Sequence, residues 1–191
     1  MSKSRLEAFS DGVFAVIITI MVLDMKVPRG TNFEALRPLA PVFLCYVLSY
    51  VYLGIYWNNH HHLLHASERV TGRILWANLI LLFCLSLVPF TTAWMGENSL
   101  APLPVAVYGM VLLSAGIAYF ALTKNLIAHH GKNSVLARSI GNDWKGTASL
   151  LVYFLAIPLA FVKPWLACAC YAVVAIMWLF PDPRIEKHLY E

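Results

Sequence analysis

The chain has 191 residues, of which 60% are hydrophobic and only 13% are charged, and its formal net charge is +4. A soluble domain of this length carries about 25% charged residues, so the composition excludes an ordinary soluble fold and predicts an integral membrane protein. The positive balance does not indicate a nucleic-acid partner, because no basic cluster with interleaved aromatic residues accompanies it. All four cysteines fall inside apolar segments, so we expect neither a disulfide framework nor a metal site.

Six apolar segments, separated by polar residues, predict an all-α membrane protein with six transmembrane helices in a single domain, residues 1–191. The segments are expected at about 7–25, 39–57, 74–94, 105–127, 148–162 and 165–180. Residues 58–62 are expected to close the second segment, and residues 181–183 the sixth. Pro89 predicts a kink near the end of the third segment, and Gly109 and Gly116 predict close helix contacts in the fourth.

The distribution of lysine and arginine predicts the orientation in the membrane. Six spans place both termini on one side, and cytoplasmic segments carry the excess of these cations. With the N-terminus inside, ten of them face the cytoplasm: Lys3, Arg5, Arg69, Arg73, Lys124, Lys132, Arg138, Lys145, Arg184 and Lys187. The four in outer loops are Lys26, Arg29, Arg37 and Lys163. Both termini are therefore expected in the cytoplasm.

The first apolar segment differs from an ordinary lipid-facing helix. Arg5, Glu7 and Asp11 precede its apolar run, which extends for 12 residues from Gly12 to Leu23, and Asp24 follows it. Twelve residues rise only about 18 Å, whereas about 20 apolar residues are needed to cross about 30 Å of hydrocarbon. We therefore expect this helix to face protein or water, as a helix along a permeation pathway does.

Helical phase divides this first helix into two sides. At about 100° per residue, one stripe about 100° wide is formed by Gly12, Val16, Thr19, Ile20 and Leu23. Asp11 lies about 140° from Val16, so it is expected to point toward neighbouring helices. A carboxylate inside the membrane needs a partner. The candidates are Arg5 of the same or an adjacent chain, Ser10, and the histidines between His60 and His65.

The sequence Arg5-x-x-x-Phe9-Ser10-Asp11, followed by Gly-Val-Phe-Ala and an aliphatic helix, resembles the signature of the transmembrane protein 175 family. Members of that family are potassium channels of endosomes and lysosomes, with bacterial homologues. Animal members carry two six-helix repeats and bacterial members carry one. This chain carries one, so it resembles a bacterial member, and the resemblance implies a multi-pass protein of the bacterial cytoplasmic (inner) membrane.

The resemblance also implies an assembly and a set of pore residues. In the family, four copies of the first helix surround a central pore, so a homotetramer is expected here. Hydrophobic rings are implied at Val16, Ile20 and Leu23, and a hydroxyl linked with ion selectivity at Thr19. The motif residues Arg5, Phe9, Ser10 and Asp11 are implied to hold the pore helix in position. Valine departs from the isoleucine or leucine implied at position 16 and could leave a wider constriction.

Two polar features outside the stripe are candidates for supporting roles. Asp24 could concentrate cations at the outer mouth of a pore, or it could be a solvated helix end paired with Lys26. Asn58, His61 and His65 could hydrogen-bond the first helix at the cytoplasmic boundary, and histidines there could make gating sensitive to pH. His61 and His65 share a helix face as zinc ligands often do, but no third ligand accompanies them. We therefore predict neither a metal site nor an enzyme.

The sequence thus predicts a potassium-permeable cation channel in which ions pass passively through a hydrophobic constriction. It needs no cofactor beyond the permeant potassium ions. No threonine-valine-glycine-tyrosine-glycine segment occurs in the chain, so the usual carbonyl filter is excluded. The alternative is a secondary transporter that carries a small cation or a proton on its intramembrane aspartates. Its broken mid-membrane helices are not indicated, because glycine and proline cluster near the ends of the predicted spans.

Overall fold

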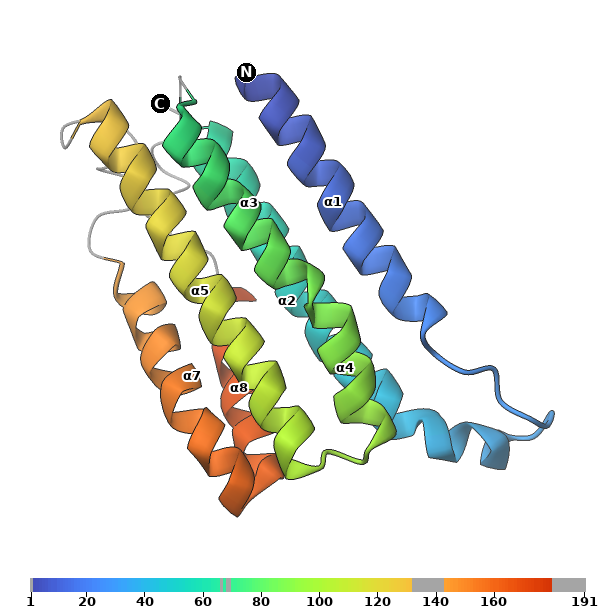
Figure 1. The fold of residues 1–191 in the computed structure, drawn as a ribbon. Coiled ribbons are helices and arrows are strands. Elements are labelled where there is room, and N and C mark those ends of the chain that lie inside the picture. The colour runs from blue at the N-terminus through green and yellow to red at the C-terminus, as the bar shows by residue number, and fades with distance from the viewer. Residues whose placement is uncertain (1, 66, 68–69, 132–142, 180–191) are drawn as a thin grey trace.

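The computed structural model describes residues 2–65, 67, 70–131 and 143–179, and within these the chain forms a bundle of helices (Figure 1). Consecutive helices run in alternating directions, except that α4 continues in the direction of α3, and α1 lies at one edge of the view with α7 at the other. Their bounds are α1 Lys3–Leu23, α2 Ala40–His65, α3 Gly72–Ser86, α4 Val88–Glu97, α5 Pro102–His130, α7 Trp144–Val162 and α8 Pro164–Leu179.

A short 3₁₀ segment, η1 (Phe33–Leu39), precedes α2 and was not predicted. It projects beyond α1 at the end of the bundle opposite the N-terminus (Figure 1). The side chain of Asn32 accepts a hydrogen bond from the Ala35 amide and so caps its start.

Helix ends follow local signals in the sequence. Thr71 caps α3 by accepting a hydrogen bond from the Ile74 amide, and Asp143 caps α7 by accepting one from Gly146. Pro164 opens α8 directly after Lys163, which leaves a tight connection from α7. The third apolar segment is divided at Leu87 into α3 and α4, where Pro89 removes a backbone donor.

The second helix differs from the prediction at its end. Residues 58–62 do not close it; α2 continues through them to His65. Polar side chains are compatible with a helix that has passed the apolar layer, since the backbone bonds are made within the helix itself. The predicted stop at residues 181–183 lies outside the described residues, as do Phe180, Arg69, Lys132, Arg138, Arg184 and Lys187.

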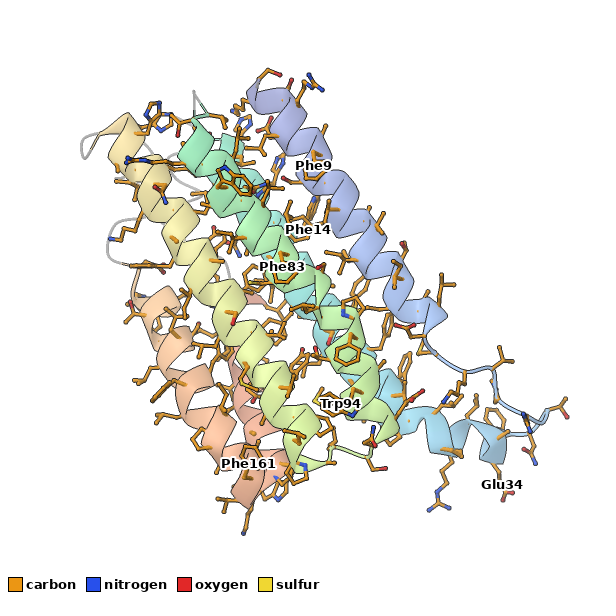
Figure 2. The ribbon with its side chains drawn as sticks, in the orientation of Figure 1. Phe9, Phe14, Glu34, Phe83, Trp94 and Phe161 are labelled. Carbon is orange, nitrogen blue, oxygen red and sulfur yellow. The ribbon has the colours of Figure 1, made fainter. Side chains whose placement is uncertain are left out.

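The surface of the bundle is apolar. Phe83 and Phe161 are more than half exposed on its outside (Figure 2), as are Leu151, Phe154 and Ile176. Within the described residues, five helical stretches are long and apolar enough to cross a bilayer, and α8 is a shorter apolar helix. Large exposed apolar surfaces of this extent are covered by lipid or by another protein.

Buried hydrogen bonds between side chains and backbone groups join the helices inside the bundle. The Ser49 hydroxyl lies 2.6 Å from that of Thr92 and 3.0 Å from that of Tyr108, which connects α2 with α4 and α5. Tyr52 donates a hydrogen bond of 2.6 Å to the carbonyl of Tyr171 on α8. Because buried hydroxyls must find partners, these bonds fix which faces of the helices meet. They join α2 to α4, two of the helices against which α1 packs.

Candidate functional site: the first helix and its supports

The first helix has two apolar sides, and only one of them is covered by the chain. The covered side packs against α2, α3 and α4. Its buried residues are Leu6, Ser10, Phe14, Ile17 and Met21. The other side contains the predicted stripe, Gly12, Val16, Thr19, Ile20 and Leu23, and all five are exposed. When a helix leaves an apolar face exposed on the outside of its own bundle, a second surface is needed to cover that face.

The stripe borders a groove between α1 and α4. Val16 and Ile20 line it from α1, with 55% and 43% of their surfaces exposed, and Phe90 and Ala93 line it from α4. Asp24 and Glu97 also line this groove. The groove is therefore mostly apolar, with Ser86 as a polar lining residue, and it carries carboxylates where α1 and α4 both end.

Thr19 is the polar member of the stripe. Its hydroxyl lies 2.9 Å from the carbonyl of Ala15 and 3.1 Å from that of Val16, so it donates to its own helix. A hydroxyl that donates inward keeps its oxygen lone pairs directed outward. Thr19 thus offers an oxygen on an otherwise apolar and exposed face.

A buried polar network ties α1 to two other helices. The Ser10 hydroxyl donates to the carbonyl of Leu6 at 2.8 Å and accepts from the Asn78 amide at 3.0 Å. The remaining amide oxygen of Asn78 lies 2.6 Å from Nε2 of His60. Because that oxygen can only accept, Nε2 of His60 carries the proton in this arrangement. Ser10, Asn78 and His60 are all at most 1% exposed.

Asp11 has a different partner from those expected. The indole nitrogen of Trp57 on α2 donates a hydrogen bond of 3.0 Å to its carboxylate. The Trp57 ring in turn stacks on His61, at 6.2 Å between ring centroids, and His61 stacks on His65 at 6.0 Å. Arg5 is exposed and joins neither of the two ion pairs formed among the described residues.

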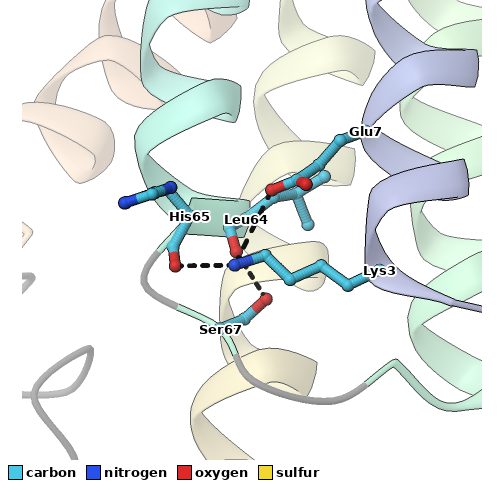
Figure 3. A network of polar contacts seen from close by, with 5 residues as sticks. All are labelled: Lys3, Glu7, Leu64, His65 and Ser67. Atoms are coloured by element: carbon cyan, nitrogen blue, oxygen red, sulfur yellow. Dashed lines mark hydrogen bonds and ion pairs between the residues drawn. The ribbon is translucent and has the colours of Figure 1, made fainter.

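The beginning of α1 is attached to the end of α2 through Lys3 (Figure 3). The Lys3 ammonium donates a hydrogen bond of 2.8 Å to the backbone carbonyl of His65 and lies 3.8 Å from the carboxylate of Glu7. Ser67 bonds back to the carbonyl of Leu64 at 2.7 Å and so turns the chain after α2. A lysine at the C-terminal end of a helix also interacts favourably with its carbonyls.

Only part of this support was predicted from the sequence. Asn58, His61 and His65 are exposed and stay outside the buried network, whereas His60 and Asn78 form it. A signal for Asn78 exists, since it is a lone amide within the apolar run of α3 and polar side chains in such runs seek partners. Lys26 forms an ion pair of 2.8 Å with Glu97 rather than with Asp24. In the described part of the chain, no group of three histidine, cysteine or acidic residues could hold a metal ion.

Comparison with known proteins places this arrangement in a family. The family model described as the endosomal/lysosomal potassium channel TMEM175 matches residues 5–89, a range that contains the first-helix motif, His60 and Asn78. A potassium channel of Chryseobacterium sp. (strain P1-3) is 51% identical over 191 residues, which is 100% of each chain. The chain belongs to the TMEM175 family. The resemblance seen in the first-helix motif is thereby confirmed.

Two further proteins resemble this chain over nearly its whole length. A potassium channel of Streptomyces collinus is 33% identical over 198 residues, covering 96% of each chain. The crystal structure of a lysosomal potassium-selective channel TMEM175 homolog from Chamaesiphon minutus superposes with a TM-score of 0.80 at 29% identity. It covers 93% of this chain and 96% of that one. The predicted all-α membrane fold with six helical segments is confirmed.

Proposed function

We propose that this chain is the subunit of a potassium-permeable channel through which ions move passively down their gradient. The observation that carries the proposal is the apolar stripe on α1, which is exposed although the opposite side of the same helix is buried. The names of the Chryseobacterium and Streptomyces relatives and of the Chamaesiphon structure support potassium as the permeant ion. The family consists of ion channels, so the chain is not an enzyme.

The channel assembles as a homotetramer around a central axis. One α1 cannot enclose a pore, and a closed ring is the usual arrangement of identical subunits. Four copies of the stripe would place Val16, Ile20 and Leu23 in successive rings, with the Thr19 oxygens between the first two. Narrow apolar rings gate conduction by excluding water, which makes a hydrophobic constriction the expected gate.

Two of the motif residues, Ser10 and Asp11, hold this pore helix together with their partners, whereas Arg5 and Phe9 are exposed. Ser10 fixes its rotation through Asn78, Asp11 fixes it through Trp57, and Lys3 fixes the height of its first turn against α2. Each contact lies on the side of α1 away from the stripe or before it begins. The pore surface can therefore be apolar while the opposite side is held by polar bonds.

The protein is a membrane protein, and we place it in the bacterial inner membrane with both termini in the cytoplasm. Lysine and arginine asymmetry supports this orientation. It puts Lys3, Arg73 and the end of α2 at the cytoplasmic boundary and the acidic pair Asp24 and Glu97 at the outer mouth.

The test is recording from the purified full-length protein in planar bilayers with potassium on one side and sodium on the other. A channel gives a reversal potential set by the two gradients and a current without saturable coupled turnover. Val16→Asn is expected to raise the conductance, because an amide would wet the hydrophobic ring proposed at this position. The matched control is Val22→Asn, which changes an exposed valine of the same helix outside the stripe. Equal effects of the two variants would contradict the assignment of Val16.

A further inference from the structure

A second groove lies between α3 and α5, away from the pore helix. It shares no residue with the groove beside α1. Its lining residues are Gly72, Arg73, Trp76, Ala77, Ile80, Ala118, Ala121 and Asn125. The side chains of four of these residues are small: Gly72, Ala77, Ala118 and Ala121. They leave a groove that is open to the outside of the bundle.

The groove changes in polarity along its length. On α3 it runs from Gly72 to Ile80, which is about 12 Å of helix. The neighbouring helix α5 runs in the opposite direction (Figure 1), so Asn125 lies toward the Arg73 end and Ala118 toward the Ile80 end. The order is therefore a guanidinium and an amide, then an indole, then aliphatic side chains.

The charged end of the groove carries the guanidinium of Arg73. Arg73 is exposed and forms no ion pair with any described residue. Beside it, 70% of the Trp76 surface is exposed, and tryptophan prefers the level of lipid headgroups in a membrane. The planar guanidinium of arginine matches the oxygens of a phosphate.

We propose that this groove binds an anionic glycerophospholipid. The phosphate lies against Arg73 and Asn125, the glycerol region lies beside Trp76, and one acyl chain occupies the floor made by Ala77, Ala118 and Ala121. The order of groups along the groove, from charged to interfacial to apolar, matches the order of phosphate, glycerol and acyl chain in the lipid. Arg73 stands at the start of α3, at the same end of the bundle as Lys3, where the proposed orientation places the cytoplasmic leaflet and its negative lipids.

Native mass spectrometry of the purified full-length protein in detergent tests the headgroup. The probes are phosphatidylglycerol and phosphatidylcholine with identical acyl chains, added in equal amounts. The wild-type protein is expected to retain more phosphatidylglycerol, and Arg73→Gln is expected to lower its retention about fivefold, as for loss of one cation near the surface. The control is Arg37→Gln, which removes an exposed cation at the opposite end of the bundle. Equal retention of the two lipids, or equal effects of the two variants, would overturn the proposal.

A second pair of variants tests the acyl-chain seat. Ala121→Leu fills the groove at an exposed position, so folding should not be disturbed, and it is expected to reduce retention of phosphatidylglycerol. Ala128→Leu makes the same change on the exposed surface of α5 outside the groove and should have no effect. Unchanged retention of phosphatidylglycerol in Ala121→Leu would overturn the proposed position of the acyl chain. Loss of the oligomer in Ala121→Leu alone would instead identify the groove as a contact between subunits. Neither measurement uses ion flux, so its failure is distinct from failure of the channel proposal.

Discussion

Asn78 on α3 donates a hydrogen bond of 3.0 Å to the hydroxyl of Ser10 on α1, and both side chains are fully buried. The same amide accepts from His60 on α2, so one side chain connects three helices. Because the bonds are made inside the bundle, they specify the rotation of α1 about its own axis, and hence which residues are left on its outer side. A polar contact on the buried side of α1 thereby determines which of its residues form the exposed stripe.

Replacing Asn78 with leucine tests the strength of this connection. The change keeps the volume of the side chain but leaves the buried Nε2 proton of His60 without an acceptor, which costs about 1–3 kcal/mol. We expect the purified variant to have a lower midpoint temperature of thermal unfolding, measured by intrinsic fluorescence. Asn98→Leu is the control, because the Asn98 side chain is exposed and its amide bonds to the Trp94 carbonyl four residues earlier. Equal midpoints for the two variants would argue against the network.

Trp57 and Asp11 should behave as a coupled pair. Trp57→Phe keeps a ring but removes the donor, and Asp11→Ala removes the acceptor. If the 3.0 Å bond contributes, the double variant loses less stability than the sum of the single variants, by about 1 kcal/mol. The comparison pair, Trp57→Phe with Asp24→Ala, has no shared contact and should be additive. Additive losses in both pairs would show that the bond is not stabilising.

How far the sequence predicts this protein depends on the range of the interactions involved. The helices follow from apolar runs, the α3–α4 break from Pro89, and the exposed stripe from the helical phase of α1. The partners of Ser10 and Asp11 do not follow, because they lie 68 and 46 residues away and no local spacing encodes them. The extension of α2 to His65 was also missed, because polar residues after an apolar run resemble a loop until Lys3 is seen to bind there.

Gly109 illustrates a packing feature that the sequence did indicate. A Cβ at this position would lie 2.8 Å from Cζ of Tyr171 and would overlap its hydroxyl oxygen, and it would approach Ile157. We expect Gly109→Ala to destabilise the protein by about 1–3 kcal/mol through overpacking. At Gly54, no heavy atom of the described residues outside its own helix turn lies within 4 Å of an added Cβ. Gly54→Ala should therefore be neutral or slightly stabilising, and a similar loss in both variants would be inconsistent with close packing at Gly109.

Thr19→Val removes the one hydroxyl of the stripe while preserving its shape. Because the hydroxyl is exposed and bonded to its own helix, little stability should be lost. If its oxygens contact permeating ions, the preference for potassium over sodium should fall, which a shift in reversal potential under bi-ionic conditions would measure. Thr147→Val, at an exposed position on α7, is the matched control and should leave the reversal potential unchanged. The same reversal potential in both variants would remove Thr19 from the selectivity determinants.

Asp24 should influence conduction through its charge. Lys26 is engaged with Glu97 at 2.8 Å, so the carboxylate of Asp24 is not neutralised by the lysine that follows it. In the proposed tetramer, a ring of such carboxylates at the outer mouth would raise the local potassium concentration, so we expect Asp24→Asn to reduce single-channel conductance at low ionic strength. The difference should vanish near 1 M salt, where the screening length falls to about 3 Å from about 30 Å at 0.01 M. Glu34→Gln, which removes an exposed acid on η1, is the control. A reduction in Asp24→Asn that persists undiminished at high salt would indicate a structural change instead of an electrostatic one.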